Sequence, residues 1–166
     1  MSITVWRQWL VLGLFALAPV HNSGAAGIPD IIGTWKANVS IQTPPGFGDF
    51  LDLFSFSGGG VLAESHPLYS PYHPLGTILY APGLGSWRSE PNGGYVARFI
   101  LPMQGAPDNQ NYAGQFIGTN TIDYTLTLDS TGTLLSGAWT ATGRDVNGNI
   151  TLSANGTMSA TRVEVR

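Results

Sequence analysis

Hydrophobic and polar residues alternate with a period of two along most of the chain, and no segment keeps the 3.6-residue period of an amphipathic helix. Segment 33–41 shows the pattern clearly, because Trp35, Ala37, Val39 and Ile41 fall on one face and polar side chains on the other. Similar alternation predicts further strands at 50–56, 61–64, 86–90, 95–101, 119–128, 134–142 and 150–163.

Short turns join most of these strands. Asn92-Gly93 and Asn147-Gly148 lie between alternating segments, where Asn-Gly is a strong hairpin signal. Asn155-Gly156 interrupts the last strand, as a bulge or as a further turn. The pattern thus predicts eight strands, with nine or ten as the alternative count. An antiparallel series of this length usually closes, because closure removes exposed edges. We predict an all-β fold, an up-and-down antiparallel β-barrel of about eight strands, with a β-sandwich as the alternative.

Residues 65–83 break the alternation. This segment holds four prolines, which are incompatible with a central strand, and its aromatic content argues against disorder. A loop of this length in a small domain is usually functional, and we predict that it covers the barrel mouth as a lid. The spacing of its histidines matches no standard metal motif, so we predict no metal site and no cofactor. Its candidate functional residues are His66, Tyr69, Tyr72, His73 and Tyr80.

The first 26 residues are predicted to be a cleaved signal peptide. Arg7 precedes the apolar segment 9–18, and small residues lead up to a cleavage site near Ala26. The apolar segment is shorter than the roughly 20 residues of a membrane-spanning helix, which disfavours an uncleaved anchor. The sequence thus predicts a secreted or periplasmic protein whose mature chain, residues 27–166, is one domain without a membrane span.

Composition narrows the chemistry. The chain has no cysteine, which excludes disulfides, thiolate chemistry and a lipid-anchored cysteine. Loss of Arg7 with the signal peptide leaves six Lys and Arg against ten Asp and Glu, and Lys36 is the only lysine. Proteins that bind the phosphates of nucleic acids need a basic patch, so nucleic acid is not a predicted partner.

Aromatic residues recur on the predicted inner faces of the strands. They suit a packed core, because an eight-stranded barrel is just wide enough for side chains to fill it. They equally suit a cavity for a small hydrophobic or aromatic molecule, since Ala37, Ala97, Gly137 and Ala141 on the same faces leave room. The candidate lining residues are Phe54, Phe56, Trp87, Tyr95, Phe99, Tyr124 and Trp139.

Asp52 has the same strand parity as Phe54 and Phe56. A carboxylate on an aromatic face requires a partner or water. Asp52 is therefore a candidate polar handle for a ligand, or a base with a raised pKa. The simpler interpretation, which we favour, places Asp52 near the start of its strand, at the solvated rim of the barrel.

Gly33-Thr34-Trp35 opens the first predicted strand, and Arg162 lies near the end of the last. In a closed barrel these strands are neighbours, so the Arg162 guanidinium can stack on the Trp35 ring and bond to nearby carbonyl groups. The combination resembles the calycin superfamily, lipocalins and their relatives, in which a Gly-x-Trp near the start pairs with an Arg near the end. The resemblance implies a calycin-like barrel sealed at one end by Trp35 and Arg162, with the 65–83 loop at the other, and it implies no particular ligand.

Three functions are compatible with these features. The first is an extracytoplasmic lipocalin-like barrel that binds a small, mostly apolar ligand. The second is a cofactor-free isomerase or cyclase in which Asp52, His66 or His73 acts as acid or base. The third is a structural, envelope-associated β-domain with a filled core. No standard catalytic motif is present in the sequence to decide among them.

Overall fold

The computed structural model describes residues 30–45, 48–67, 69–71 and 73–164, and over these ranges the regular structure consists of β-strands alone. The signal peptide predicted at residues 1–26 lies outside the described residues. Within them, no helix is long and apolar enough to cross a membrane. The strands are β1 (Gly33–Thr43), β2 (Phe50–Ser57), β3 (Val61–Ser65), β4 (Tyr69–Ser70), β5 (Ile78–Tyr80), β6 (Gly83–Ser89), β7 (Tyr95–Gly105), β8 (Phe116–Leu128), β9 (Leu134–Asp145) and β10 (Ile150–Arg162).

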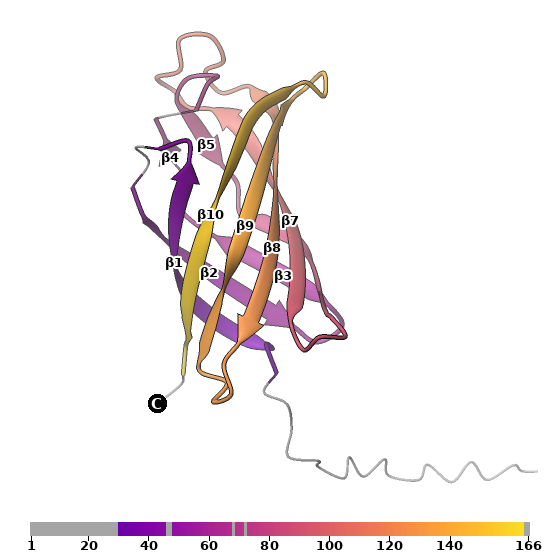
Figure 1. The fold of residues 1–166 in the computed structure, drawn as a ribbon. Helices are drawn as coiled ribbons and strands as arrows, with labels where there is room; N and C mark the ends of the chain where they lie inside the picture. The colour runs from indigo at the N-terminus through magenta and orange to yellow at the C-terminus, as the bar shows by residue number, and fades with distance from the viewer. Residues whose placement is uncertain (1–29, 46–47, 68, 72, 165–166) are drawn as a thin grey trace, which may run out of the picture.

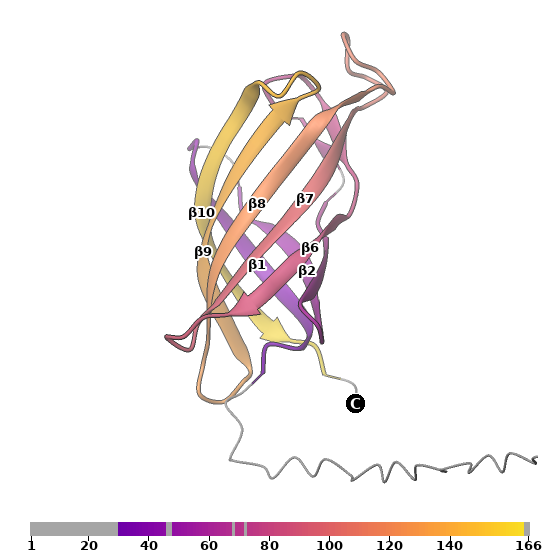
Figure 2. The ribbon, with the colours of Figure 1, turned by 90° about the vertical axis from the view of Figure 1, so that its right-hand side faces the viewer.

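Eight of these strands close into an antiparallel barrel (Figures 1 and 2). Around the barrel the order is β1, β2, β3, β6, β7, β8, β9 and β10, and the last strand pairs with the first. In the closing ladder between β1 and β10, Trp35 lies opposite Arg162. The predicted up-and-down barrel is therefore confirmed, and the β-sandwich alternative is wrong.

The segment 65–83 contains a short hairpin where the sequence predicted only irregular structure. β4 pairs with β5, and β5 pairs with the last residues of β7, where Ile78 lies opposite Gly105. β7 pairs with β6 only as far as Ile100, so the same edge of β7 is free to accept β5 beyond that point. The four prolines lie outside β4 and β5, so they do not interrupt this pairing.

The hairpin is attached to the barrel by one buried side chain and a small apolar cluster. The Asn109 Nδ2 donates to the carbonyl oxygens of Leu75 (3.0 Å) and Thr77 (2.8 Å), so Asn109 ties the hairpin to the β7–β8 connection. Beneath it, Ile78 packs with two buried side chains of the barrel, Met103 and Ile117. These contacts give the segment a defined position over one side of the barrel mouth.

Several strand limits differ from the predicted ones. β7 continues through Pro102, although the predicted strand ended at residue 101. Pro102 lies between the part of β7 that pairs with β6 and the part that pairs with β5, so its missing N–H interrupts neither of these pairings. Its carbonyl accepts from the Ala81 N–H (3.0 Å). β10 is continuous through Asn155-Gly156, and the bulge lies in β1 opposite this pair, between Ile41 and Thr43.

The start of β1, which holds Trp35, and the end of β10, which holds Arg162, lie at the barrel end opposite to the β4–β5 hairpin (Figure 1). The Arg162 Cζ is 4.4 Å from the centroid of the fully buried Trp35 ring. The guanidinium also donates to the carbonyl oxygens of Gly132 (2.9 Å), Ile32 (2.6 Å) and Asp30 (2.5 Å). One side chain thus links the segment before β1, the β8–β9 turn and the end of β10. Its contact with the Trp35 ring confirms the cation–π interaction that the sequence predicted.

Replacing Arg162 with alanine is expected to lower the free energy of unfolding by about 1–3 kcal/mol, because the ring contact and three hydrogen bonds are lost together. Urea denaturation followed by tryptophan fluorescence measures the change. Thr161→Ala, at the exposed neighbouring position, is the matched control and should unfold like the wild type. Equal unfolding midpoints for Arg162→Ala and this control would contradict a stabilising role for the closure.

Candidate functional site

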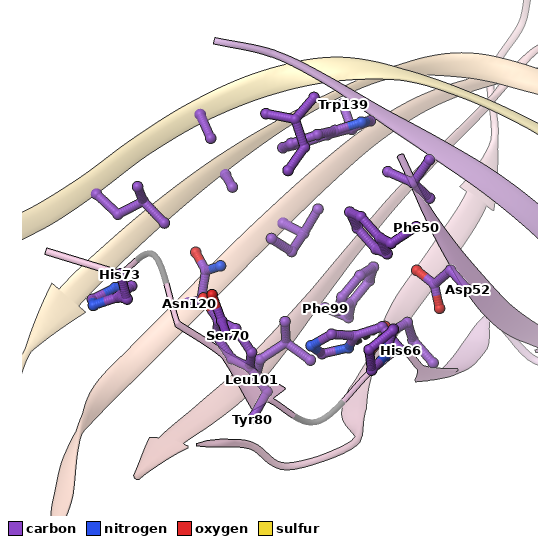
Figure 3. Close-up of a pocket in the computed structure, with 18 of the residues that line it drawn as sticks. Phe50, Asp52, His66, Ser70, His73, Tyr80, Phe99, Leu101, Asn120 and Trp139 are labelled. Carbon is purple, nitrogen blue, oxygen red and sulfur yellow. Dashed lines mark hydrogen bonds and ion pairs between the residues drawn. The ribbon is translucent and has the colours of Figure 1, made fainter. Parts of the chain in front are cut away.

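The half of the barrel below the hairpin is hollow, with a cavity of about 250 Å³. Its walls come from the inner faces of the barrel strands and, on one side, from the 65–83 segment (Figure 3). Most lining side chains are apolar, and the barrel contributes Val39, Ile41, Phe50, Phe99, Leu101, Ile122, Tyr124, Trp139, Ala141, Leu152 and Ala154. Five buried or nearly buried polar side chains interrupt this surface: Asp52, Glu64, His66, His73 and Asn120.

Stacked aromatic rings line the inner side of the cavity. Phe99 and Tyr124 stack with ring centroids 5.8 Å apart and an interplanar angle of 21°. Phe54 packs edge-on against Tyr124, at 5.4 Å between centroids, on the side away from the cavity. The aromatic packing continues through Phe56, whose centroid lies 6.0 Å from that of Trp87. The rings therefore fill the closed half of the barrel and leave the other half hollow.

The predicted lining residues divide between these two halves. Phe99, Tyr124 and Trp139 line the cavity, as does Asp52. Four of the candidate lining residues do not line this cavity and instead pack against one another in the core: Phe54, Phe56, Trp87 and Tyr95. Strand parity identifies inward side chains correctly, but it does not show how far along the barrel each one lies.

Trp139 forms part of the cavity wall at a place where its own strand, β9, lies close to β10. Its partner in the β9–β10 ladder is Gly156, and a Cβ added there would lie 2.9 Å from the Trp139 ring and 1.9 Å from the Ser40 carbonyl oxygen. The Trp139 Nε1 donates to the Thr157 carbonyl (3.3 Å). The glycine therefore provides the space that the indole occupies, and a side chain at position 156 would displace it.

Asp52 is only 2 % exposed, so the prediction that it lies at the wet rim is wrong. The 65–83 segment closes this side of the barrel, and Phe50, which starts β2, packs against His66 with ring centroids 6.4 Å apart. Burial, the charge of Glu64 and a hydrogen bond with Glu64 together hold the pKa of the Asp52 carboxyl far above its ordinary value of 3.8. Asp52 is therefore protonated at neutral pH.

Glu64 and His66 complete the polar group around Asp52. Glu64 is 3 % exposed, its Oε1 lies 2.6 Å from the His66 Nδ1, and its Oε2 accepts from the Gly83 N–H (3.1 Å). A Cβ at Gly83 would lie 2.6 Å from that same oxygen, so the absence of a side chain allows the carboxylate to lie there. Sequence reasoning did not select Glu64 as a site residue, although alternation with Leu62 in the third predicted strand places it on the inner face.

His73 and Asn120 lie on another part of the cavity wall, apart from Asp52 and His66 (Figure 3). The His73 Nδ1 accepts from the Leu75 N–H (3.2 Å), and burial lowers the pKa of the imidazole to about 4, so the ring is neutral at pH 7. Tyr80 lines the same wall, and burial raises the pKa of its hydroxyl to about 12, against the opposing effect of a hydrogen bond with Asn120.

Of the remaining predicted residues, Tyr69 lines the mouth but is 52 % exposed, and its hydroxyl donates to Asp108 Oδ2 (3.0 Å). Tyr72 lies outside the described residues. The described residues that line the cavity include no lysine or arginine. Among the described residues, no group of three or more His, Cys, Asp or Glu is placed to hold a metal ion. The wall is thus apolar, with acidic and neutral hydrogen-bonding groups at two places.

Comparison with protein families, with curated proteins and with solved structures finds no match for this chain. The interpretation of the site therefore depends on its own geometry.

Asp52→Asn is expected to remove a loss of stability at alkaline pH. The unfolded chain releases the Asp52 proton near pH 4 and the folded protein retains it, so the free energy of unfolding falls as pH rises, by at most about 1.4 kcal/mol per pH unit. His73, with its lowered pKa, affects stability only between about pH 4 and 6.5, so the measurement covers pH 7 to 9. Urea denaturation should give a falling curve for the wild type and a flatter one for Asp52→Asn, whereas parallel curves would contradict the assignment.

Proposed function

We propose that this barrel binds a small, mostly apolar molecule in its hollow half. The observation that carries the proposal is the cavity of about 250 Å³, bounded by stacked aromatic rings on its inner side and by aliphatic and aromatic walls. An apolar cavity of about 150 Å³ is already large enough to hold benzene. An apolar surface with a few well-placed polar groups is typical of small-molecule sites.

The division of the barrel into two halves supports this function. The closed half holds the packed aromatic side chains and the contact between Trp35 and Arg162, which stabilise the fold without using the cavity. A purely structural domain would have a filled interior, and in this barrel only the closed half is filled. The hollow half is covered by the separately attached 65–83 segment, so ligand entry need not disturb the main core.

The cellular location and the family relation in this proposal come from the sequence. The apolar segment 9–18 and the small residues before position 26 suit export to the periplasm or the cell exterior. Gly33-Thr34-Trp35 and Arg162 suit a calycin-like protein. We therefore propose an extracytoplasmic, lipocalin-like binding protein, and N-terminal sequencing of the exported product would test the cleavage near Ala26.

The hydrophobic fluorescent probe N-phenyl-1-naphthylamine is expected to bind with one-to-one stoichiometry and a Kd on the order of 10 µM. Its emission should rise as it enters the cavity. Ala154→Trp should weaken binding at least about tenfold, because Ala154 lines the cavity and the indole would occupy it. Ser153→Trp, at the exposed adjacent position, is the matched control and should bind the probe like the wild type.

Two results would contradict the binding function. One is the absence of saturable binding by the wild type. The other is equal binding by Ala154→Trp and Ser153→Trp, which would place the probe on the outer surface of the barrel.

A second candidate function is cofactor-free proton transfer, as in an isomerase or cyclase. The specific observation that favours it is the common position of Asp52, Glu64 and His66 on one cavity wall. The Glu64 carboxylate orients the His66 ring through Nδ1, as a carboxylate orients a catalytic imidazole base, and protonated Asp52 lies beside this pair. In such a step, the His66 Nε2 accepts a proton from a carbon next to a carbonyl and returns it, so the molecule is neither oxidised nor reduced.

Deuterium exchange tests this candidate. With 4-phenylbutan-2-one bound in heavy water, the protein is expected to accelerate exchange of the protons next to the ketone above the rate in buffer, as measured by NMR. His66→Phe should return the exchange to the buffer rate, because the ring keeps its shape but loses the base. Exchange at the buffer rate in the wild type, with the ketone shown to be bound, would contradict proton transfer.

A further inference from the structure

Five buried side-chain atoms in the described part of the chain have no hydrogen-bond partner there. Four of them belong to residues that line the cavity: Asp52 Oδ1, His66 Nε2, His73 Nε2 and Asn120 Oδ1. The residues Asp52, His73 and Asn120 are at most 6 % exposed, and the His66 side chain is 9 % exposed. Because buried polar groups are normally hydrogen-bonded, this concentration in one cavity points to a ligand that supplies the partners.

Asp52 and His66 together present acceptors. The protonated Asp52 carboxyl shares a hydrogen bond with Glu64, so the unpaired Oδ1 is left as an acceptor. The His66 Nδ1 lies 2.6 Å from the Glu64 carboxylate, and when the ring is neutral with its proton on Nδ1, the unpaired Nε2 is also an acceptor. A ligand group that satisfies this part of the wall must donate, as a hydroxyl or an N–H group does.

His73 presents a donor on the other part of the wall. Because its Nδ1 accepts from the Leu75 N–H and the ring is neutral, the proton lies on Nε2. A ligand oxygen such as a ketone satisfies this N–H. Asn120 beside it has one unpaired acceptor, Oδ1, and adds no charge.

The charge of the wall excludes one class of ligand. The acidic side chains of Asp52 and Glu64 line the cavity, and its described lining residues include no lysine or arginine to balance an anion. Transfer of a carboxylate into this apolar space without a partner is strongly unfavourable. A neutral ligand meets the same groups without that penalty.

We propose that the cavity selects a neutral, mostly aromatic molecule with a hydroxyl at one end, held by Asp52 and His66, and a carbonyl oxygen at the other, held by His73. This specificity rests on the proposed binding function and assigns its ligand class. The aromatic body lies against Phe99, Tyr124 and Trp139, and the two polar ends fix its direction in the barrel.

Calorimetry with the full chain and four compounds of similar shape measures how much the hydroxyl and the ketone each contribute to the affinity. Butylbenzene is the apolar body, 4-butylphenol adds the hydroxyl, 4-phenylbutan-2-one adds the ketone, and 4-(4-hydroxyphenyl)butan-2-one carries both. Each added group is expected to tighten binding about tenfold, as one hydrogen bond to an otherwise unpaired group does. The anion 4-butylbenzoate is expected to bind more weakly than butylbenzene.

Two variants should remove the two preferences separately. The double substitution of Asp52→Leu with His66→Phe removes both acceptors, so it should abolish the preference for the hydroxyl and retain that for the ketone, and His73→Phe should do the reverse. The preference that each variant keeps requires a folded cavity, so each variant also serves as its own control for folding. Asp52→Asn is the conservative control, because its amide can donate to Glu64 and still present an acceptor, and it should retain the preference for the hydroxyl.

Several results would overturn the assignment. Equal affinities for butylbenzene and 4-butylphenol would mean that water satisfies the unpaired atoms, while binding of butylbenzene would leave the proposed binding function intact. Retention of the hydroxyl preference when Asp52→Leu and His66→Phe are combined would place the contact elsewhere. Tighter binding of 4-butylbenzoate than of butylbenzene would contradict a site for neutral ligands. If none of the four neutral compounds binds, the proposed binding function itself fails.

Discussion

The pairing of β1 with β10 is the constraint on which the rest of the structure depends. These strands lie at opposite ends of the described chain, and their ladder turns an open sheet with two exposed edges into a barrel with an enclosed interior. Only in the closed barrel do the buried rings of Trp35, Phe54 and Tyr124 leave water together. The closure also brings Arg162 to three carbonyl oxygens from two distant segments, which fixes that end of the barrel firmly.

At the opposite end of the barrel, β7 changes its pairing partner. Over residues 95–100 it pairs with β6, and beyond Pro102 it pairs with β5, so the 65–83 hairpin enters the wall where β6 and β7 no longer meet. Small inward residues alone do not create the cavity, since only Ala141 of the four predicted to leave room lines it. The hairpin that pairs with β7 beyond this point leads into the 65–83 residues that line the cavity, and the Asn109 hydrogen bonds hold the hairpin in place.

A buried acid pair is an unusual element in such an interior. Burial of Asp52 and Glu64 requires one proton to stay on the pair and leaves polar atoms facing the cavity, both of which work against folding. Apolar residues of similar size at these positions would favour the folded state in many proteins. Folding alone therefore does not account for the pair, and strongly perturbed carboxyl groups in a cavity are typical of functional sites. The geometry suits recognition of a ligand donor and, if a substrate binds there, proton transfer.

The class of fold could be predicted from local properties of the chain, since period-two alternation and Asn-Gly turns indicate antiparallel strands. The contact between Trp35 and Arg162 could also be predicted, once the sheet was assumed to close. Parity also placed Phe99, Tyr124 and Trp139 inward. Which of the inward residues line the cavity could not be predicted, because the position of a side chain along the barrel axis depends on strand tilt and on long-range pairing. For the same reason Asp52 was misplaced and Glu64 overlooked: their burial and their shared proton arise from contacts between β2, β3 and the inserted hairpin, and these contacts exist only in three dimensions.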